Sequence, residues 1–166
     1  MSLEDLGNIG EFVAAVGVIV SLIYLAVQIR QNTKTVRTST YQEVLDYSNR
    51  FNELVLSNPH IERIWRVGRR DPAQLTEDER PQFRLLFVQL LNIYETMLLQ
   101  YQRGTLDQEY WSARLVGFRD LLTQPALRAH WLRWREEGNT AVRVPAFQEL
   151  VNSLVDLPSD QDGPDA

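Results

Sequence analysis

The chain has 166 residues, a formal net charge of −5 and no cysteine. This length suits one domain, and an ordinary hydrophobic share of 44% argues against general disorder. The lack of cysteine excludes disulfides, zinc–thiolate sites, iron–sulfur clusters and a cysteine nucleophile, and the acidic balance argues against nucleic-acid binding.

The first predicted element is a membrane-spanning helix. Residues 12–27 read FVAAVGVIVSLIYLAV and carry no charge, and an extension over 9–29 gives the roughly 20 residues that a helix needs to cross a bilayer. The alternative is a core helix of a soluble protein, but such helices are usually shorter or carry a polar stripe. A cleaved signal peptide fits less well, because the preceding residues are acidic and no small-residue cleavage site follows. The segment is therefore expected to remain as an anchor.

The charges that flank this span predict its orientation. Three acidic residues and no cation precede it, whereas Arg30, Lys34 and Arg37 follow it directly. Because the positive flank of a span stays in the cytoplasm, we expect the N-terminus outside and the C-terminus in the cytoplasm. The same three cations can also contact anionic lipid headgroups, at about 1 kcal/mol each, but a plain topology signal is the preferred interpretation.

Small and polar residues form a stripe along the predicted span. It consists of Gly10, Ala14, Gly17, Ser21, Tyr24 and Gln28, separated alternately by four and three residues. This heptad spacing places them on one helix face, and small residues let membrane helices approach one another closely. The stripe predicts helix–helix packing with a second copy or with another membrane protein. The alternative is that glycine and alanine are common in membrane helices and mark no contact.

The rest of the chain predicts an all-α fold. Residues 30–57 are expected to form a juxtamembrane helix, because no Pro or Gly occurs before Pro59 and apolar residues recur at helical spacing. These residues are Val36, Thr40, Val44, Tyr47, Phe51 and Leu54. The outer N-terminus and the span together occupy residues 1–29, and whether the juxtamembrane helix continues the span is left open.

Residues 58–157 predict a small cytoplasmic helical bundle. Helices are expected near 60–67, 76–103, 107–123, 125–137 and 145–156, with a loop over 68–72. The strongest signal is the capping box of Thr76 and Glu79, and Gly104 ends the helix that it begins. The acidic tail, 158–166, is expected to be disordered.

No catalytic, metal or cofactor site is predicted. The two histidines, His60 and His130, lack the spacing of metal-binding helices, and no phosphate loop or hydrolase elbow occurs. Arginines around Trp131 and Trp134 are interpreted as a solvated face over a tryptophan core, not as a nucleic-acid site. The pair Arg69–Arg70, in the predicted loop, is too small a feature to define a site.

The segment Leu22–Gln42, LIYLAVQIRQNTKTVRTSTYQ, resembles a group of uncharacterised bacterial membrane-anchored proteins of the domain-of-unknown-function type. In these proteins a single span runs into a YLAxQIRQNT segment. The stretch Tyr94–Gly104, the helix around Trp111 and the helix Pro125–Trp134 are similar to their helical region. The resemblance implies a bacterial inner-membrane location and a helical fold, but it carries no activity.

Three functions are compatible with these features. The first is a membrane-anchored helical interaction protein without catalysis, self-assembling or an accessory subunit of a larger inner-membrane complex. The second is an oligomeric channel or transport-related protein, for which Ser21, Tyr24 and Gln28 offer little polar lining. The third is an enzyme or a ligand-binding sensor with a pocket in the helical bundle, for which no nucleophile–base pair is present. The expected partners are the lipid bilayer and a second copy or a larger membrane complex, but not nucleic acid.

Overall fold

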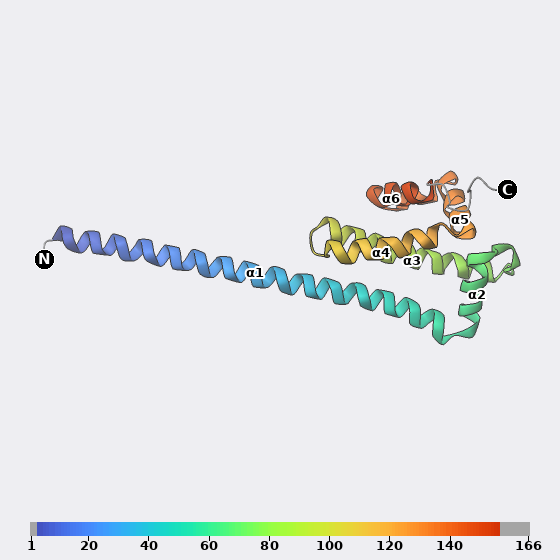
Figure 1. Ribbon diagram of the computed structural model, residues 1–166, viewed down its shortest axis with the longest axis horizontal. Helices are drawn as coiled ribbons and strands as arrows, with labels where there is room; N and C mark the ends of the chain where they lie inside the picture. Colours follow the sequence, from blue (N-terminus) through green and yellow to red (C-terminus); the bar gives the residue numbers. More distant parts are fainter. Residues whose placement is uncertain (1–2, 157–166) are drawn as a thin grey trace, which may run out of the picture. The chain divides into compact units, whose positions relative to one another are not determined.

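The computed structural model describes the backbone of residues 3–156, together with their side chains apart from residues 3–10, 13 and 141. Over this range the chain is all-α, as predicted, with six α-helices and two short 3₁₀ helices (Figure 1). In chain order these are α1 Leu3–Ser57, α2 Pro59–Arg70, η1 Pro72–Gln74, α3 Glu79–Gln102, α4 Gln108–Leu122, α5 Pro125–Glu136, η2 Asn139–Val142 and α6 Pro145–Val155. The predicted acidic tail lies outside the described residues.

The segments predicted as a span and as a juxtamembrane helix form one continuous helix, α1, of 55 residues. Two compact units meet within it, Met1–Ser39 and Thr40–Ala166. The predicted domain boundary at 57/58 coincides with the end of α1, but the bundle unit begins already at Thr40. The last turns of α1 therefore belong to the bundle and are not a separate juxtamembrane domain.

The face of α1 that is buried in the bundle unit includes only part of the apolar repeat of residues 36–54. Val44 and Val55 are buried and Phe51 packs against the core, whereas Tyr47 and Leu54 are about half exposed. Periodicity predicts a helix here but does not show which of its residues meet the core. The helix that this repeat predicts is present, because α1 runs to Ser57.

Helix α2 is longer than predicted and passes through Gly68. The sequence suggested a loop from Gly68 to Pro72, but α2 continues to Arg70. A Cβ atom built on Gly68 would lie 2.3 Å from the ring of Phe83 on α3, so the glycine allows these two helices to pack closely. The close approach, and not a turn, explains this glycine.

The predicted capping box at the start of α3 is half formed. The backbone N–H of Thr76 donates to the Glu79 carboxylate at 3.0 Å, but α3 begins at Glu79 itself, and Asp78 precedes it without a side-chain cap bond. Arg63 on α2 forms an ion pair with the same carboxylate. Glu79 therefore ties the start of α3 to α2.

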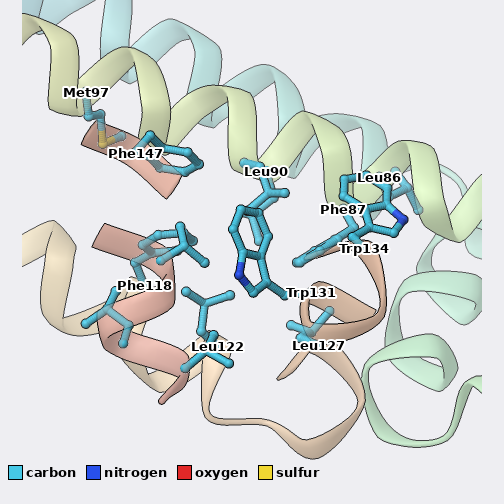
Figure 2. Packing of buried hydrophobic residues seen from close by; sticks show 14 of the residues in the cluster. Leu86, Phe87, Leu90, Met97, Phe118, Leu122, Leu127, Trp131, Trp134 and Phe147 are labelled. Atoms are coloured by element: carbon cyan, nitrogen blue, oxygen red, sulfur yellow. The ribbon is translucent and has the colours of Figure 1, made fainter. Parts of the chain in front are cut away.

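The core of the bundle surrounds the indole of Trp131, which is fully buried (Figure 2). Leu90, Leu122 and Leu127 lie around this ring in the figure. The indole N–H donates to the Asn152 amide oxygen at 2.9 Å, so its polar atom is satisfied where α5 meets α6. Trp131 thus forms the centre of the tryptophan core that the sequence predicted.

Candidate functional site

The first candidate site is the membrane-length region of α1. An 18-residue window within Ala14–Ser57 is long and apolar enough to cross a bilayer, and none of this window is buried in the structure. The buried core helix of a soluble protein passes the same length and composition test but hides its side chains. One helix near the N-terminus, within the described residues, therefore has the properties of a membrane span.

The predicted stripe of small residues lies on the surface of this helix. Ala14, Gly17 and Ser21 are all exposed, and a Cβ atom built on Gly17 would meet nothing within 4 Å. The Ser21 hydroxyl donates to the Gly17 carbonyl at 2.8 Å, so its hydrogen-bond donor is already used within the helix. Gly10 belongs to α1, but its surroundings lie outside the described residues.

The polar end of the stripe is paired within the helix. The Gln28 amide donates to the Tyr24 hydroxyl at 3.2 Å, one turn away. Both side chains are exposed, so each keeps further hydrogen-bonding capacity toward a neighbouring helix. The structure therefore brings these two residues together on one face, as the spacing predicted.

The three predicted headgroup cations lie on a flank of the stripe. Arg30, Lys34 and Arg37 are exposed, and their spacing of four and three residues puts them on one helix face. Each precedes by one residue a position of the continued stripe, Gln31, Thr35 and Thr38. No ion pair of these cations occurs among the residues that the structure describes.

A second candidate site, which sequence reasoning did not locate, is a cavity of about 280 Å³ within the bundle unit. Four helices line it: α1, α2, α3 and α4. Its apolar lining consists of Phe51, Trp65, Leu90, Ile93, Met97 and Leu121. Its polar lining consists of Ser48, Asn52, Arg69, Tyr94 and Arg114. Burial raises the pKa of Tyr94, so this phenol stays neutral and can donate a hydrogen bond.

Arg69 is a partly buried polar residue in the lining of this cavity. Its Nε atom is buried and has no hydrogen-bond partner among the described residues. Its guanidinium lies 5.3 Å from the centre of the Trp65 ring, a cation–π arrangement. Burial and the neighbouring Arg70 lower the pKa of Arg69, although it stays charged at neutral pH. The extension of α2 through Gly68 brings Arg69 here, so the interpretation of Arg69 as a loop residue was wrong.

A third group of buried polar residues joins α3 to the segment before α6. The Arg143 guanidinium is buried and donates to the Glu95 carboxylate at 2.7 Å and to the Asn92 side chain. The same carboxylate accepts the backbone N–H of Val144 at 2.7 Å. These bonds fix the segment that precedes α6 against α3. Because both charged side chains are largely buried and already paired with each other, the cluster has a structural role.

His130 is enclosed by aromatic rings. Phe87 lies 5.2 Å and Trp134 5.0 Å away between ring centres, and the buried Nε2 atom has no hydrogen-bond partner in the described chain. Burial, helped by Arg84 and Arg133, lowers the pKa of His130 to about 4. The ring is therefore neutral at pH 7.

No cluster of three or more potential metal ligands occurs among the residues for which side chains are described. Comparison with protein families, with curated proteins and with solved structures finds no match for this chain. The resemblance of Leu22–Gln42 to bacterial membrane-anchored proteins therefore stays a prediction.

Proposed function

We propose that this protein is a membrane-anchored helical protein that assembles through α1, with a second copy of itself or within a larger inner-membrane complex. Its role in this proposal is binding and not catalysis. The observation that carries the proposal is the open, exposed stripe of small residues around Gly17, on a helix long and apolar enough to cross a bilayer.

The physical argument starts from the lipid environment. Inside a bilayer the hydrophobic effect does not drive helices together, so close packing of backbones and interhelical hydrogen bonds must do so. Gly17 and Ala14 offer a surface on which a second backbone can approach closely. Tyr24 and Gln28, on the same face, add hydrogen-bonding groups near the end of the apolar segment. These features support a parallel contact between two α1 helices.

The cations favour the same arrangement. Arg30, Lys34 and Arg37 lie beside the stripe and not on it, so a partner helix on the stripe leaves them free for lipid headgroups. We propose that they mark the cytoplasmic side of a bacterial inner membrane, with the N-terminus outside. The bundle unit then faces the cytoplasm.

Exchange of one small residue tests the assembly. Gly17→Leu places bulk on the stripe, whereas Ala15→Leu places similar bulk on the opposite face of the helix. We expect the wild type and Ala15→Leu to have the mass of an oligomer in mild detergent, measured by light scattering after size exclusion, and Gly17→Leu to shift toward the monomer. A monomeric wild type without a co-purifying partner, or equal masses of all three proteins, would contradict the proposal.

A further inference from the structure

The cavity of the bundle has an unusual balance of charge. Two arginines, Arg69 and Arg114, contribute to its lining, and none of the described lining residues is acidic. The acid whose charge acts on Arg69 is Glu62, and its carboxylate already accepts a hydrogen bond from Arg66 at 2.9 Å. The lining of the cavity therefore carries two cationic side chains and no acid beside an apolar wall, and the nearby Glu62 only partly offsets the charge of Arg69.

The arginine on α2 has a hydrogen-bonding group without a partner. The buried Nε–H of Arg69 meets neither a carboxylate nor a carbonyl among the described residues, and such a group costs free energy when it is desolvated. Trp65 covers the guanidinium face at 5.3 Å but cannot accept a hydrogen bond in the plane of the group. An acceptor in the cavity would satisfy this donor.

The arginine on α4 lines the same cavity. Arg114 is exposed, its guanidinium lies 5.0 Å from the centre of the Tyr110 ring, and no described acid lies within ion-pair distance of it. Its side chain is flexible, so it can turn toward an anion without disturbing the core. Tyr94, which also lines the cavity, can add a phenol donor.

We propose that this cavity binds a small organic anion that carries one carboxylate on an apolar body. The carboxylate would pair with Arg69 and Arg114, and the body would pack on Phe51, Trp65 and Met97. A volume of about 280 Å³ holds a ligand of roughly ten non-hydrogen atoms, at about 30 Å³ for each water-sized group.

Other ligand classes fit these residues less well. A cation would be repelled by the two arginines, and a neutral apolar molecule would leave the Arg69 Nε–H unpaired. Inorganic phosphate would satisfy the charges but would leave the aromatic and aliphatic walls without contact. The inference concerns the bundle unit alone, so it stands or falls independently of assembly through α1.

A matched set of small ligands tests the proposal. We would titrate 3-phenylpropionate into the full chain in phosphatidylcholine nanodiscs by calorimetry, with empty nanodiscs as the blank. 3-Phenylpropionamide has the same shape without the charge, and acetate has the charge without the body. We expect the carboxylate to bind about tenfold or more tightly than the amide, and acetate to bind too weakly to detect. Equal affinity for carboxylate and amide, or no binding of 3-phenylpropionate, would overturn the proposal.

Variants then locate the site. Arg69→Gln is expected to weaken binding of 3-phenylpropionate about tenfold, whereas Arg70→Gln, which removes the same charge from the next, exposed position, is expected to leave it unchanged. Ser48→Leu fills the cavity from α1 and should abolish binding although both arginines remain. Equal weakening by Arg69→Gln and Arg70→Gln, or full binding by Ser48→Leu, would show that the anion binds elsewhere.

Folding of each variant is checked by its thermal unfolding transition without ligand. If Arg69→Gln does not fold, Arg114→Gln replaces it, because Arg114 is exposed and its loss does not disturb the core. The same tenfold weakening supports the proposal, and unchanged affinity in Arg114→Gln overturns it.

Discussion

Gly68 determines how closely α2 approaches α3. The position that a Cβ atom would take lies 2.3–2.7 Å from three carbon atoms of the Phe83 ring, and Phe83 is itself buried. The ring has little room to move because Trp65 lies 6.0 Å and His130 6.0 Å away between ring centres. A methyl group at Gly68 must therefore separate the two helices or force the ring out of its place.

We expect Gly68→Ala to lower the free energy of unfolding by about 1–3 kcal/mol, the usual cost of overpacking a core. Gly117→Ala on α4 is the matched control, because a Cβ atom there meets nothing within 4 Å. Alanine is the better helix former, so the control should be neutral or stabilising by up to about 1 kcal/mol. Chemical denaturation of both variants measures the difference, and a gain in stability for Gly68→Ala would contradict this packing.

The ion pair of Arg143 and Glu95 is expected to matter more than an exposed pair. Removal of the arginine in Arg143→Met leaves the Glu95 carboxylate largely buried without its partner, which typically costs about 3–5 kcal/mol. Arg135→Met breaks the pair with Asp156, whose side chains are 38% and 56% exposed, and should cost at most about 1 kcal/mol. Equal losses in urea denaturation would show that the buried pair has no special role.

His130 predicts how stability depends on pH. Its pKa is about 4 in the folded bundle and about 6.5 in the unfolded chain. Between these values the unfolded state binds more protons, so stability is complete above pH 6.5 and falls as the pH decreases toward 4. Since the ring is partly exposed, we expect this loss to be on the order of 1–2 kcal/mol after screening.

His130→Phe removes the titrating group and should flatten stability over this range. His60→Gln removes the other histidine, which is exposed on α2, and serves as the comparison variant. Thermal melts at pH 7, 6, 5 and 4.5 provide the comparison. If His130→Phe keeps the wild-type slope, acidic groups and not this histidine cause it.

At the scale of the elements, most helix ends could be predicted because local chemistry sets them. Pro59, Pro125 and Pro145 each occupy a first helical turn, and Gly104 and Gly138 have the positive φ angles of 71° and 73° that suit residues after a helix end. These signals involve neighbours along the chain. They are therefore visible without knowledge of the tertiary structure.

The features that escaped prediction depend on contacts between distant residues. Gly68 was interpreted as a loop residue because its partner, Phe83, lies on another helix. The cavity beside Arg69 could not be predicted for the same reason, because its lining residues come from four different helices that must first pack together. The stripe around Gly17 was predictable from spacing, because its residues share one helix.

At the scale of the whole molecule, the chain divides into two units that differ in how far their apolar side chains are buried. Met1–Ser39 contains the apolar region of a single helix, which has no other helix in its own unit to pack on. Thr40–Ala166 has a core of its own, centred on Trp131. In the proposed arrangement a bilayer surrounds the apolar part of the first unit, and water surrounds the second. The transition between them falls within α1, next to Arg30, Lys34 and Arg37.

The absence of cysteine makes the proposed orientation directly measurable. Two variants each carry one cysteine, which is then the only thiol in the chain. Glu11→Cys places it before the apolar segment, and Asp120→Cys places it at an exposed position of α4. With the N-terminus outside, a membrane-impermeant maleimide should label Glu11→Cys in intact spheroplasts and Asp120→Cys only after permeabilisation.

Reversal of Arg30, Lys34 and Arg37 to glutamate removes the positive flank and should weaken this preference, so that both sites become labelled in a fraction of the population. Labelling of Asp120→Cys in intact spheroplasts, with Arg30, Lys34 and Arg37 in place, would show that the orientation is opposite to the one proposed. Labelling of neither site after lysis would show that both thiols are inaccessible to the reagent. The first result would place the bundle and its cavity outside the cytoplasm, where a ligand could enter without crossing the membrane.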